Sequence, residues 1–208
     1  MQELIPGVLH WSPFNDSIGQ HVGSHYVEPL GPGGPTLIDP LIDDEAQLEA
    51  IRERGAPERI VLSIGLHRRS VERLAGEFGC PVMCHRAGVH RLEDLSARIE
   101  PFDSGADLAP GIMAVAMGAI APDDTAIHIA AGDGALLFGD GLFRYGGELG
   151  FASDALLGDD PEAERAAMAE SIRGVVASDL EFDTLLFAHG EPQVGGGRDA
   201  LARFAEGL

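Results

Sequence analysis

The chain has 208 residues, of which 34 are acidic and 14 basic, so its formal net charge is −20. This charge argues against binding nucleic acid or an anionic membrane surface, because both are bound through clustered Lys and Arg side chains. All the basic side chains are arginines, so chemistry that needs a lysine Schiff base is excluded. The length and a hydrophobic content of 45% predict one globular domain that spans residues 1–208.

The N-terminal third predicts short strands joined by turns. Residues 3–11 and 19–28 are strand candidates, and the Gly- and Pro-rich stretch 31–35 predicts a turn. A short apolar run follows at 36–40 and predicts a buried strand that ends at Asp39. The chain therefore opens as a β-meander.

The middle of the chain alternates between helices and strands. Apolar residues at helical spacing predict helices over 43–54 and 70–78, and apolar runs predict strands at 59–63 and 81–84. A β-α-β-α-β order from about residue 36 to 85 predicts parallel strands joined by crossover helices.

The second half returns to short strands and ends in helices. Its patterns predict, in chain order, strands at 111–116, 126–130 and 135–138, an amphipathic helix at 161–180, a strand at 184–188 and a helix at 198–208. Pro161 suits the first turn of the long helix, and Asp159 or Asp160 can cap it.

The cysteines and the N-terminus predict a cytoplasmic protein. Cys80 and Cys84 do not make a disulfide framework, and two buried, reduced thiols are a simpler interpretation than a Cys-x-x-x-Cys-His metal site. Residues 1–5 show neither a basic stretch nor a long apolar core, so we expect no signal peptide. No run of about 20 apolar residues predicts a membrane span.

Aspartate and histidine side chains follow several of the predicted strands. Asp39, His67, Asp140 and His189 each come after an apolar run, and His85 ends a neighbouring strand. Carboxylates and imidazoles that converge from separate strand ends are the ligands that hard or borderline metal cations require. The pattern therefore predicts a cleft with metal-binding side chains.

Three segments, in their order and spacing, resemble the metallo-β-lactamase-fold superfamily. They are TLIDP at 36–40, LLFGD at 136–140 and FAHGEP at 187–192. The resemblance implies an α/β (α+β) fold, built as a four-layer αββα sandwich with its site along one edge of the two sheets. It also implies hydrolase relatives that use one or two metal ions, usually zinc and sometimes iron.

One segment departs from that family, which carries a metal-binding H-x-H-x-D-H after a strand. The equivalent segment here is LSIGLHRRS at 62–70. A gapless alignment places at the usual ligand positions Ile64, Leu66, Arg68, Arg69 and, further on, Ala119. Of the usual ligands only Asp140 and His189 remain, whereas a catalytic zinc uses three protein ligands plus water. The resemblance thus implies that the standard dinuclear site is lost, unless a shifted register brings His67 to a ligand position.

Each candidate residue also has a structural interpretation. Asp140 could cap a turn, His189 could donate to a backbone carbonyl in a turn, and Asp39 is expected to support the site or its turn. His67 is either a replacement ligand or, more simply, an exposed loop histidine.

The two arginines of the degenerate segment also leave two interpretations open. Arg68 and Arg69 could bind an anionic ligand, because guanidinium groups match carboxylate and phosphate. Alternatively, they open a helix and face water.

Three functions remain open from the sequence. The first is a metallo-β-lactamase-fold protein that has lost most metal ligands and is non-catalytic or binds a small anion through Arg68 and Arg69. The second is a mononuclear hydrolase with rearranged ligands, which holds zinc or iron through members of the set Asp140, His189, His67 and His85. The third is an interaction or assembly subunit, which would suit a homo-oligomer. A small-molecule ligand is the expected partner in the first two cases.

Overall fold

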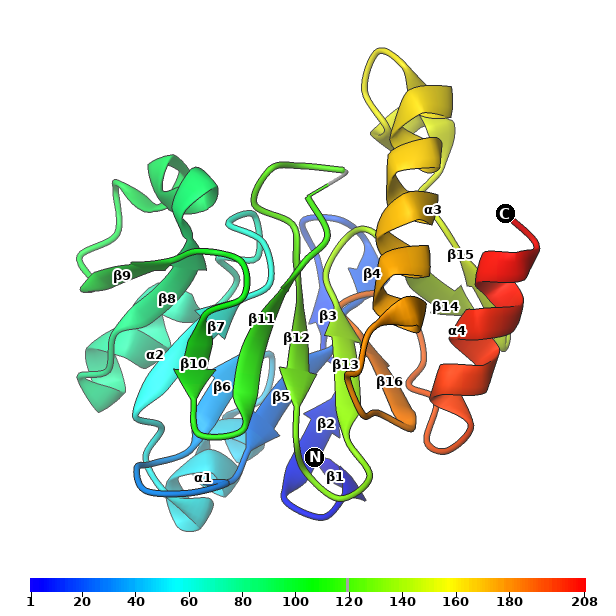
Figure 1. Cartoon of the computed structure of the whole chain (residues 1–208). Helices are drawn as coiled ribbons and strands as arrows, with labels where there is room; N and C mark the ends of the chain where they lie inside the picture. Colours follow the sequence, from blue (N-terminus) through cyan, green and yellow to red (C-terminus); the bar gives the residue numbers. More distant parts are fainter. Residues whose placement is uncertain (119) are drawn as a thin grey trace.

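Two β-sheets form the centre of the molecule (Figure 1). The computed structural model describes residues 1–118 and 120–208. The first sheet has the strand order β1 (Gln2–Ile5), β2 (Val8–Trp11), β5 (Ser24–Val27), β6 (Thr36–Ile38), β7 (Arg59–Leu62), β8 (Val82–His85) and β9 (Ile99–Phe102). The second has the order β10 (Asp107–Ala109), β11 (Ile112–Ala116), β12 (Thr125–Ile129), β13 (Ala135–Phe138) and β16 (Thr184–Phe187). Two short hairpins lie outside these sheets, namely β3 (Phe14–Asn15) with β4 (Gln20–His21) and β14 (Phe143–Tyr145) with β15 (Glu148–Gly150).

Strand direction changes once within each large sheet. β1, β2, β5 and β6 pair antiparallel, whereas β6 to β9 pair parallel. β10 to β13 pair antiparallel, and β13 pairs parallel with β16. The antiparallel opening and the following βαβαβ unit predicted from the sequence are both confirmed. Parallel pairing places the carboxyl ends of β6 and β7 at one edge of the first sheet, and those of β13 and β16 at one edge of the second.

Helices cover the outer face of each sheet. α1 (Glu45–Arg54) and α2 (Val71–Phe78) lie against the first sheet, and α3 (Pro161–Ala177) and α4 (Gly197–Glu206) lie against the second (Figure 1). A 3₁₀ helix, Arg86–Leu92, follows β8. The order of layers is therefore helix, sheet, sheet, helix, which confirms the predicted αββα sandwich.

Three apolar clusters hold these layers together. Leu48 of α1 and Leu74 of α2 pack with the outer face of the first sheet. Ile38 and Leu137, from β6 and β13, pack in the cluster between the two sheets. Ile172 of α3 lies in the cluster that covers the outer face of the second sheet. All five side chains are fully buried, and burying each contributes roughly 1.5–3 kcal/mol, so the apolar layers supply the main stabilisation of the fold.

Helix starts follow the capping signals of the sequence. The side chain of Asp160 accepts a hydrogen bond from the Ala163 N–H at 3.1 Å, with Pro161 in the first turn, so the predicted start of α3 is confirmed. The side chain of Asp44 accepts a hydrogen bond from the Ala46 N–H at 2.9 Å and starts α1 in the same way.

Five strands were not evident in the sequence: β3, which has two residues, and β9, β10, β14 and β15. β9 contains Pro101, which cannot donate a ladder hydrogen bond, and the strand is formed at the sheet edge where such a residue is tolerated. β10, β14 and β15 have three residues each, too few to show a periodic pattern. These strands exist because neighbouring strands supply their hydrogen-bond partners.

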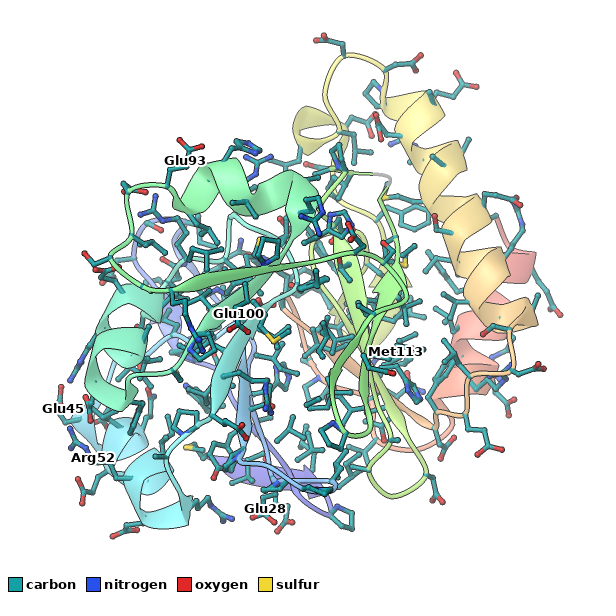
Figure 2. The ribbon with its side chains drawn as sticks, turned by 60° about the vertical axis from the view of Figure 1, so that its left-hand side comes forward. Glu28, Glu45, Arg52, Glu93, Glu100 and Met113 are labelled. Carbon is teal, nitrogen blue, oxygen red and sulfur yellow. The ribbon has the colours of Figure 1, made fainter. Side chains whose placement is uncertain are left out.

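Charged side chains lie on the outer surface, as Figure 2 shows for Glu28, Glu45 and Glu93. Exposed ion pairs such as Arg73–Glu45 stabilise a fold by about 0–1 kcal/mol each, so they add little to the apolar layers. In the described part of the chain, no helix is both long and apolar enough to cross a membrane. Cys80 and Cys84 are unpaired and buried, which confirms the interpretation of buried free thiols.

Candidate metal centre

Four strand ends carry the polar residues of one cleft. Asp39 follows β6, the loop 63–69 follows β7, Asp140 follows β13 and His189 follows β16. The cleft has a volume of about 750 Å³, and its lining includes His67, Asp140 and His189. Loops at the ends of packed strands are held by a rigid scaffold, which is the usual position for a binding or catalytic site.

His67 lies at the centre of the polar cluster. Its Nδ1 is 3.0 Å from Asp39 Oδ2, and its Nε2 is 3.0 Å from Asp140 Oδ1. The residue is only 5% exposed, so the interpretation as an exposed loop histidine is wrong. A turn explains the difference: the His67 N–H donates to the Ile64 carbonyl at 3.0 Å, and Leu66 takes the exposed position of the loop instead.

His189 faces the same carboxylate oxygen from the second sheet. Its Nε2 lies 3.2 Å from Asp140 Oδ1, and its ring centroid is 5.5 Å from that of His67. One ligand atom from each of these three residues lies within 4.8 Å of the other two. The Nδ1 atom of His189 is buried and has no hydrogen-bond partner in the described structure, so the structure does not support a turn histidine that donates to a carbonyl.

Opposite charges in the cluster shift the pKa values of its members. Burial and Arg69 disfavour charge on His67, but Asp39 and Asp140 outweigh them and raise the pKa of His67 to about 9. Burial opposes charge on Asp140 as well, yet the two imidazoles hold its pKa well below the usual range. The pKa of Asp39 is lowered despite its burial, chiefly by His67. The two carboxylates thus favour the protonated form of the His67 imidazole that lies between them.

Arg69 is anchored beside this cluster by backbone carbonyl groups. Its guanidinium donates to the carbonyls of Gly23 and Asp39, both at 2.6 Å, and to that of Ala188 at 3.5 Å. Asp39 and Arg69 are also the two non-glycine residues with positive φ in the described structure, at 48° and 33°. Such strained backbone persists only where the surroundings hold it, and it is concentrated at functional sites.

The structure does not bring Arg68 and Arg69 together. Arg68 lies at the surface, where its guanidinium donates to Asp94 at 2.7 Å. Arg69 is turned inward, so the interpretation that both face water is wrong for it. Each guanidinium already has partners within the protein, and the binding of an anionic ligand by Arg68 or Arg69 stays a prediction from the sequence.

His85 lies apart from the three clustered residues. Its Nδ1 accepts a hydrogen bond from the Ala87 N–H at 3.3 Å at the start of the 3₁₀ helix, and its Nε2 is 3.4 Å from Ser104 Oγ. Among the described residues, the group of potential metal ligands consists of His67, Asp140 and His189 and does not include His85. Ala119, which the gapless alignment placed at a family ligand position, lies outside the described residues.

Sequence analysis missed the acidic pair Asp123-Asp124. Asp124 Oδ1 accepts the Asp140 N–H at 3.2 Å, and Asp123 Oδ2 accepts the Gly65 N–H at 2.9 Å. Burial and the charge of Asp140 raise the pKa of Asp124 to about 7. The pair thus positions the two loops that carry His67 and Asp140. One feature of the sequence could have identified this pair: two adjacent aspartates stand directly before an apolar strand. A charged side chain buried there without a partner is costly, so such residues are expected to have partners.

Gly190 lets the chain turn immediately after His189. It has φ of 100°, and a Cβ there would lie 2.0 Å from the Arg144 carbonyl oxygen. We expect Gly190→Ala to lower the free energy of unfolding by at least about 2 kcal/mol, because it adds backbone strain to a steric clash.

Gly146→Ala is the matched control for that substitution. Gly146 also has positive φ, at 58°, but a Cβ added there would meet no atom within 4 Å. Urea unfolding of both variants measures the difference. Equal losses of stability in the two proteins would contradict the steric argument.

The donor set of His67, Asp140 and His189 fits one metal ion. Two imidazole nitrogens and one carboxylate oxygen are the ligands of many catalytic zinc and non-haem iron sites. His67, Asp140 and His189 supply this set beside an open cleft. Ile64 and Leu66 have no donor atoms, and the Arg69 guanidinium donates hydrogen bonds to backbone carbonyls, so none of these three side chains is a metal ligand.

Comparison with known proteins identifies the fold. No family model and no curated protein matches the chain. Solved structures do: a protein crystallised in a di-iron-bound form has a TM-score of 0.69 and 21% identity, covering 95% of this chain and 100% of that one. The metallo-β-lactamase DIM-1 has a TM-score of 0.71 and 14% identity, covering 99% and 96%. A metallo-β-lactamase family protein from Thermus thermophilus has a TM-score of 0.68 and 15% identity, covering 99% and 80%. With all four layers and the cleft at the strand ends in place, this chain has the metallo-β-lactamase fold.

Proposed function

We propose that this protein is a hydrolase that uses a single divalent metal ion, zinc or iron, held by His67, Asp140 and His189. The observation that carries the proposal is the convergence of their three ligand atoms within 4.8 Å, on the lining of a cleft of about 750 Å³. Catalytic zinc sites have three protein ligands and an open position, which this arrangement provides.

The surroundings of His67 support the same proposal. A metal-ligating histidine usually donates its second ring N–H to a carboxylate, which fixes the tautomer and the ring orientation. Asp39 Oδ2, 3.0 Å from His67 Nδ1, is placed to accept that hydrogen bond. Ser63 donates its N–H to Asp39 Oδ1 at 2.9 Å and its hydroxyl to Oδ2 at 2.5 Å, so the supporting carboxylate is itself held in place.

The chain's own residues prepare this site for hydrolysis. A bound divalent ion would supply Lewis acidity, which polarises an acyl oxygen and makes water a stronger acid. Asp39 keeps the proton on His67 Nδ1, so that Nε2 is the atom available as a ligand. Asp124 holds the backbone of Asp140, and apolar side chains line the cleft beside the cluster.

The charge balance of the cluster favours a second candidate, a metal-independent binding protein. The charges of His67 and Arg69 offset those of Asp39 and Asp140, so the cluster is neutral without an ion. This is the non-catalytic function that the sequence suggested first. We favour the hydrolase because charge balance alone does not account for a second imidazole, that of His189, converging with His67 on the carboxylate of Asp140.

Elemental analysis of protein purified without an affinity tag tests the proposal. We expect about one equivalent of zinc or iron, because three ligands and a supporting carboxylate are preformed. His189→Ala is expected to lose the metal. His85→Ala, which removes a histidine outside the cluster, is the control and is expected to retain it.

Two results would contradict the hydrolase. One is protein that holds no metal as purified and takes up neither zinc nor ferrous ion on addition. The other is His189→Ala protein with the same metal content as His85→Ala. Either result would favour the metal-independent binding protein.

The assembly-subunit hypothesis stays a prediction that the molar mass in solution tests. α3 buries Met168, Ile172 and Val175. Its apolar face is therefore already covered within the chain, which argues against α3 as a hydrophobic interface.

A further inference from the structure

Arg91 lines the cleft and is weakly held by the rest of the protein. It belongs to the 3₁₀ helix Arg86–Leu92, and its Nε lies 3.5 Å from Asp123 Oδ2. That Nε is buried and makes no hydrogen bond within the described structure. A buried donor on a charged group costs free energy when its hydrogen bond is missing, so its presence calls for an explanation, and a bound ligand supplies one.

The other arginine of the lining is committed to the protein itself. The guanidinium of Arg69 donates to three backbone carbonyls, at 2.6, 2.6 and 3.5 Å. The side chain of Arg91, in contrast, is 30% exposed although its Nε is buried, so the exposure belongs to its other atoms. Among the described lining residues, Arg91 is therefore the arginine that can bond to a ligand without giving up a hydrogen bond within the protein.

The charge of the cleft lining is opposite to that of the whole chain. The chain carries 34 acidic and 14 basic residues. The described residues that line the cleft include two arginines, Arg69 and Arg91, and one acidic residue, Asp140. A cleft lined by one sign of charge attracts ligands of the other sign, because the nearest charges dominate the potential inside it. The lining therefore favours an anion although the protein as a whole is strongly acidic.

Two residues place Arg91 against the loop that carries His67. Asp123, which is buried, accepts the Gly65 N–H at 2.9 Å and faces Arg91 Nε from the same carboxylate oxygen. A Cβ at Gly65 would lie 3.0 Å from Arg91 Cδ, so the missing side chain there leaves room for the arginine. Arg91 is thus positioned in the same cleft as the three potential metal ligands, on a separate segment of the chain.

We propose that the cleft takes a small organic carboxylate and that Arg91 is the residue that selects its negative charge. One guanidinium without an internal hydrogen bond balances one negative charge, and its planar fork matches the two oxygens of a carboxylate. A cleft of about 750 Å³ has the size of a small-molecule site. The inference concerns binding, and it rests on the proposed function only where the bound carboxylate is taken as a substrate.

NMR titration of the full-length protein with benzoate, benzamide and phenyl phosphate tests the inference. Metal is first removed with 1,10-phenanthroline, a neutral chelator that is then dialysed away, so that no probe binds through a metal ion and no chelator carboxylate competes. We expect benzoate to shift the Arg91 Nε–Hε resonance. Benzoate should bind at least about tenfold more tightly than benzamide, which has nearly the same shape without the charge. Phenyl phosphate should bind more weakly than benzoate, because its second charge has no second free guanidinium.

Two substitutions assign the selection of charge to Arg91. Arg91→Gln is expected to weaken benzoate binding by at least about tenfold and to change benzamide binding by less than about twofold. Arg86→Gln is the matched control, because Arg86 lies on the same 3₁₀ helix but is 62% exposed, pairs with Asp103 and is not part of the lining. It should leave the benzoate affinity unchanged. A variant with a damaged cleft would lose benzamide as well, and the resonance shift in the wild-type protein then still tests Arg91.

Three outcomes would overturn the inference. Benzamide binding as tightly as benzoate would show that the cleft does not select charge. Equal weakening of benzoate binding by Arg91→Gln and Arg86→Gln would indicate a long-range attraction without a contact at Arg91. Phenyl phosphate binding more tightly than benzoate would indicate a phosphate site. Because these titrations use metal-free protein, they can fail while the metal analysis of the proposed function succeeds, and the reverse.

Discussion

Replacing Asp39 by alanine is expected to lower the free energy of unfolding by about 3–5 kcal/mol. Asp39 is fully buried, and its carboxylate lies 3.0 Å from His67 Nδ1. It also accepts both hydrogen bonds of Ser63. Removing it leaves the buried imidazole of His67 and the half-buried guanidinium of Arg69 with less negative charge to offset theirs. The loss of a partner from a buried ionic group is among the most destabilising single changes in proteins.

Urea unfolding measures this loss, with Asp94→Ala as the matched control. Asp94 also forms an ion pair with an arginine, Arg68, but its side chain is 69% exposed. Removing an exposed partner should change the free energy of unfolding by no more than about 1 kcal/mol. A similar change in the two variants would show that burial of the Asp39 cluster does not contribute as argued. Asp39→Asn is expected to be intermediate, because the amide oxygen still accepts a hydrogen bond from Ser63.

Acid destabilisation below pH 6.5 is expected to depend strongly on His10. This residue pairs with His25 across β2 and β5, with His10 Nδ1 3.2 Å from His25 Nε2. Burial lowers the pKa of His10 to about 4 and that of His25 well below its ordinary value. In the unfolded chain, His10 therefore takes up a proton as the pH falls through about 6.5. In the folded protein, His10 stays neutral until the pH falls to about 4. Stability is retained above this window and lost as pH falls through it.

The difference between His10→Gln and the wild-type protein isolates this contribution. From pH 7 to pH 5, the wild type should lose about 2 kcal/mol more of its free energy of unfolding than the variant. Taking the difference at each pH cancels the carboxylate titrations that both proteins share. A difference that stays constant from pH 7 to pH 5 would contradict the argument. Any constant offset reflects packing of the substituted side chain and does not affect the test.

Local patterns predicted most of the regular elements. The apolar run 59–63 and the helical spacing over 70–78 correspond to β7 and α2, because burial of one face determines both patterns. β9 was missed because Pro101 argues against a strand unless its edge position is known. An edge position is a property of the assembled sheet and is absent from any local window of sequence.

The candidate site shows the same division. Asp140 and His189 follow recognisable strand motifs, and both reach the cluster. His67 has the same sequence neighbourhood as an exposed loop residue, and only the turn closed by the Ile64 carbonyl directs its ring inward. Arg69 had two plausible interpretations, and neither placed its guanidinium on the carbonyls of Gly23, Asp39 and Ala188. Those acceptors come from three separate segments that are adjacent only after folding.

The sequence by itself determined most of the helices and strands of this protein, because hydrophobic periodicity and turn residues act over short stretches of chain, whereas the order of the layers came from the resemblance to the metallo-β-lactamase fold. It also determined which side chains with metal-binding chemistry follow the strands. The tertiary structure alone decided which of them meet: His67 joins Asp140 and His189, whereas His85 lies apart. The physical reason is that ligand geometry requires sub-ångström placement of atoms from different sheets. Such placement follows from the packing of the two sheets, the hydrogen bonds of the loops and the balance of buried charges.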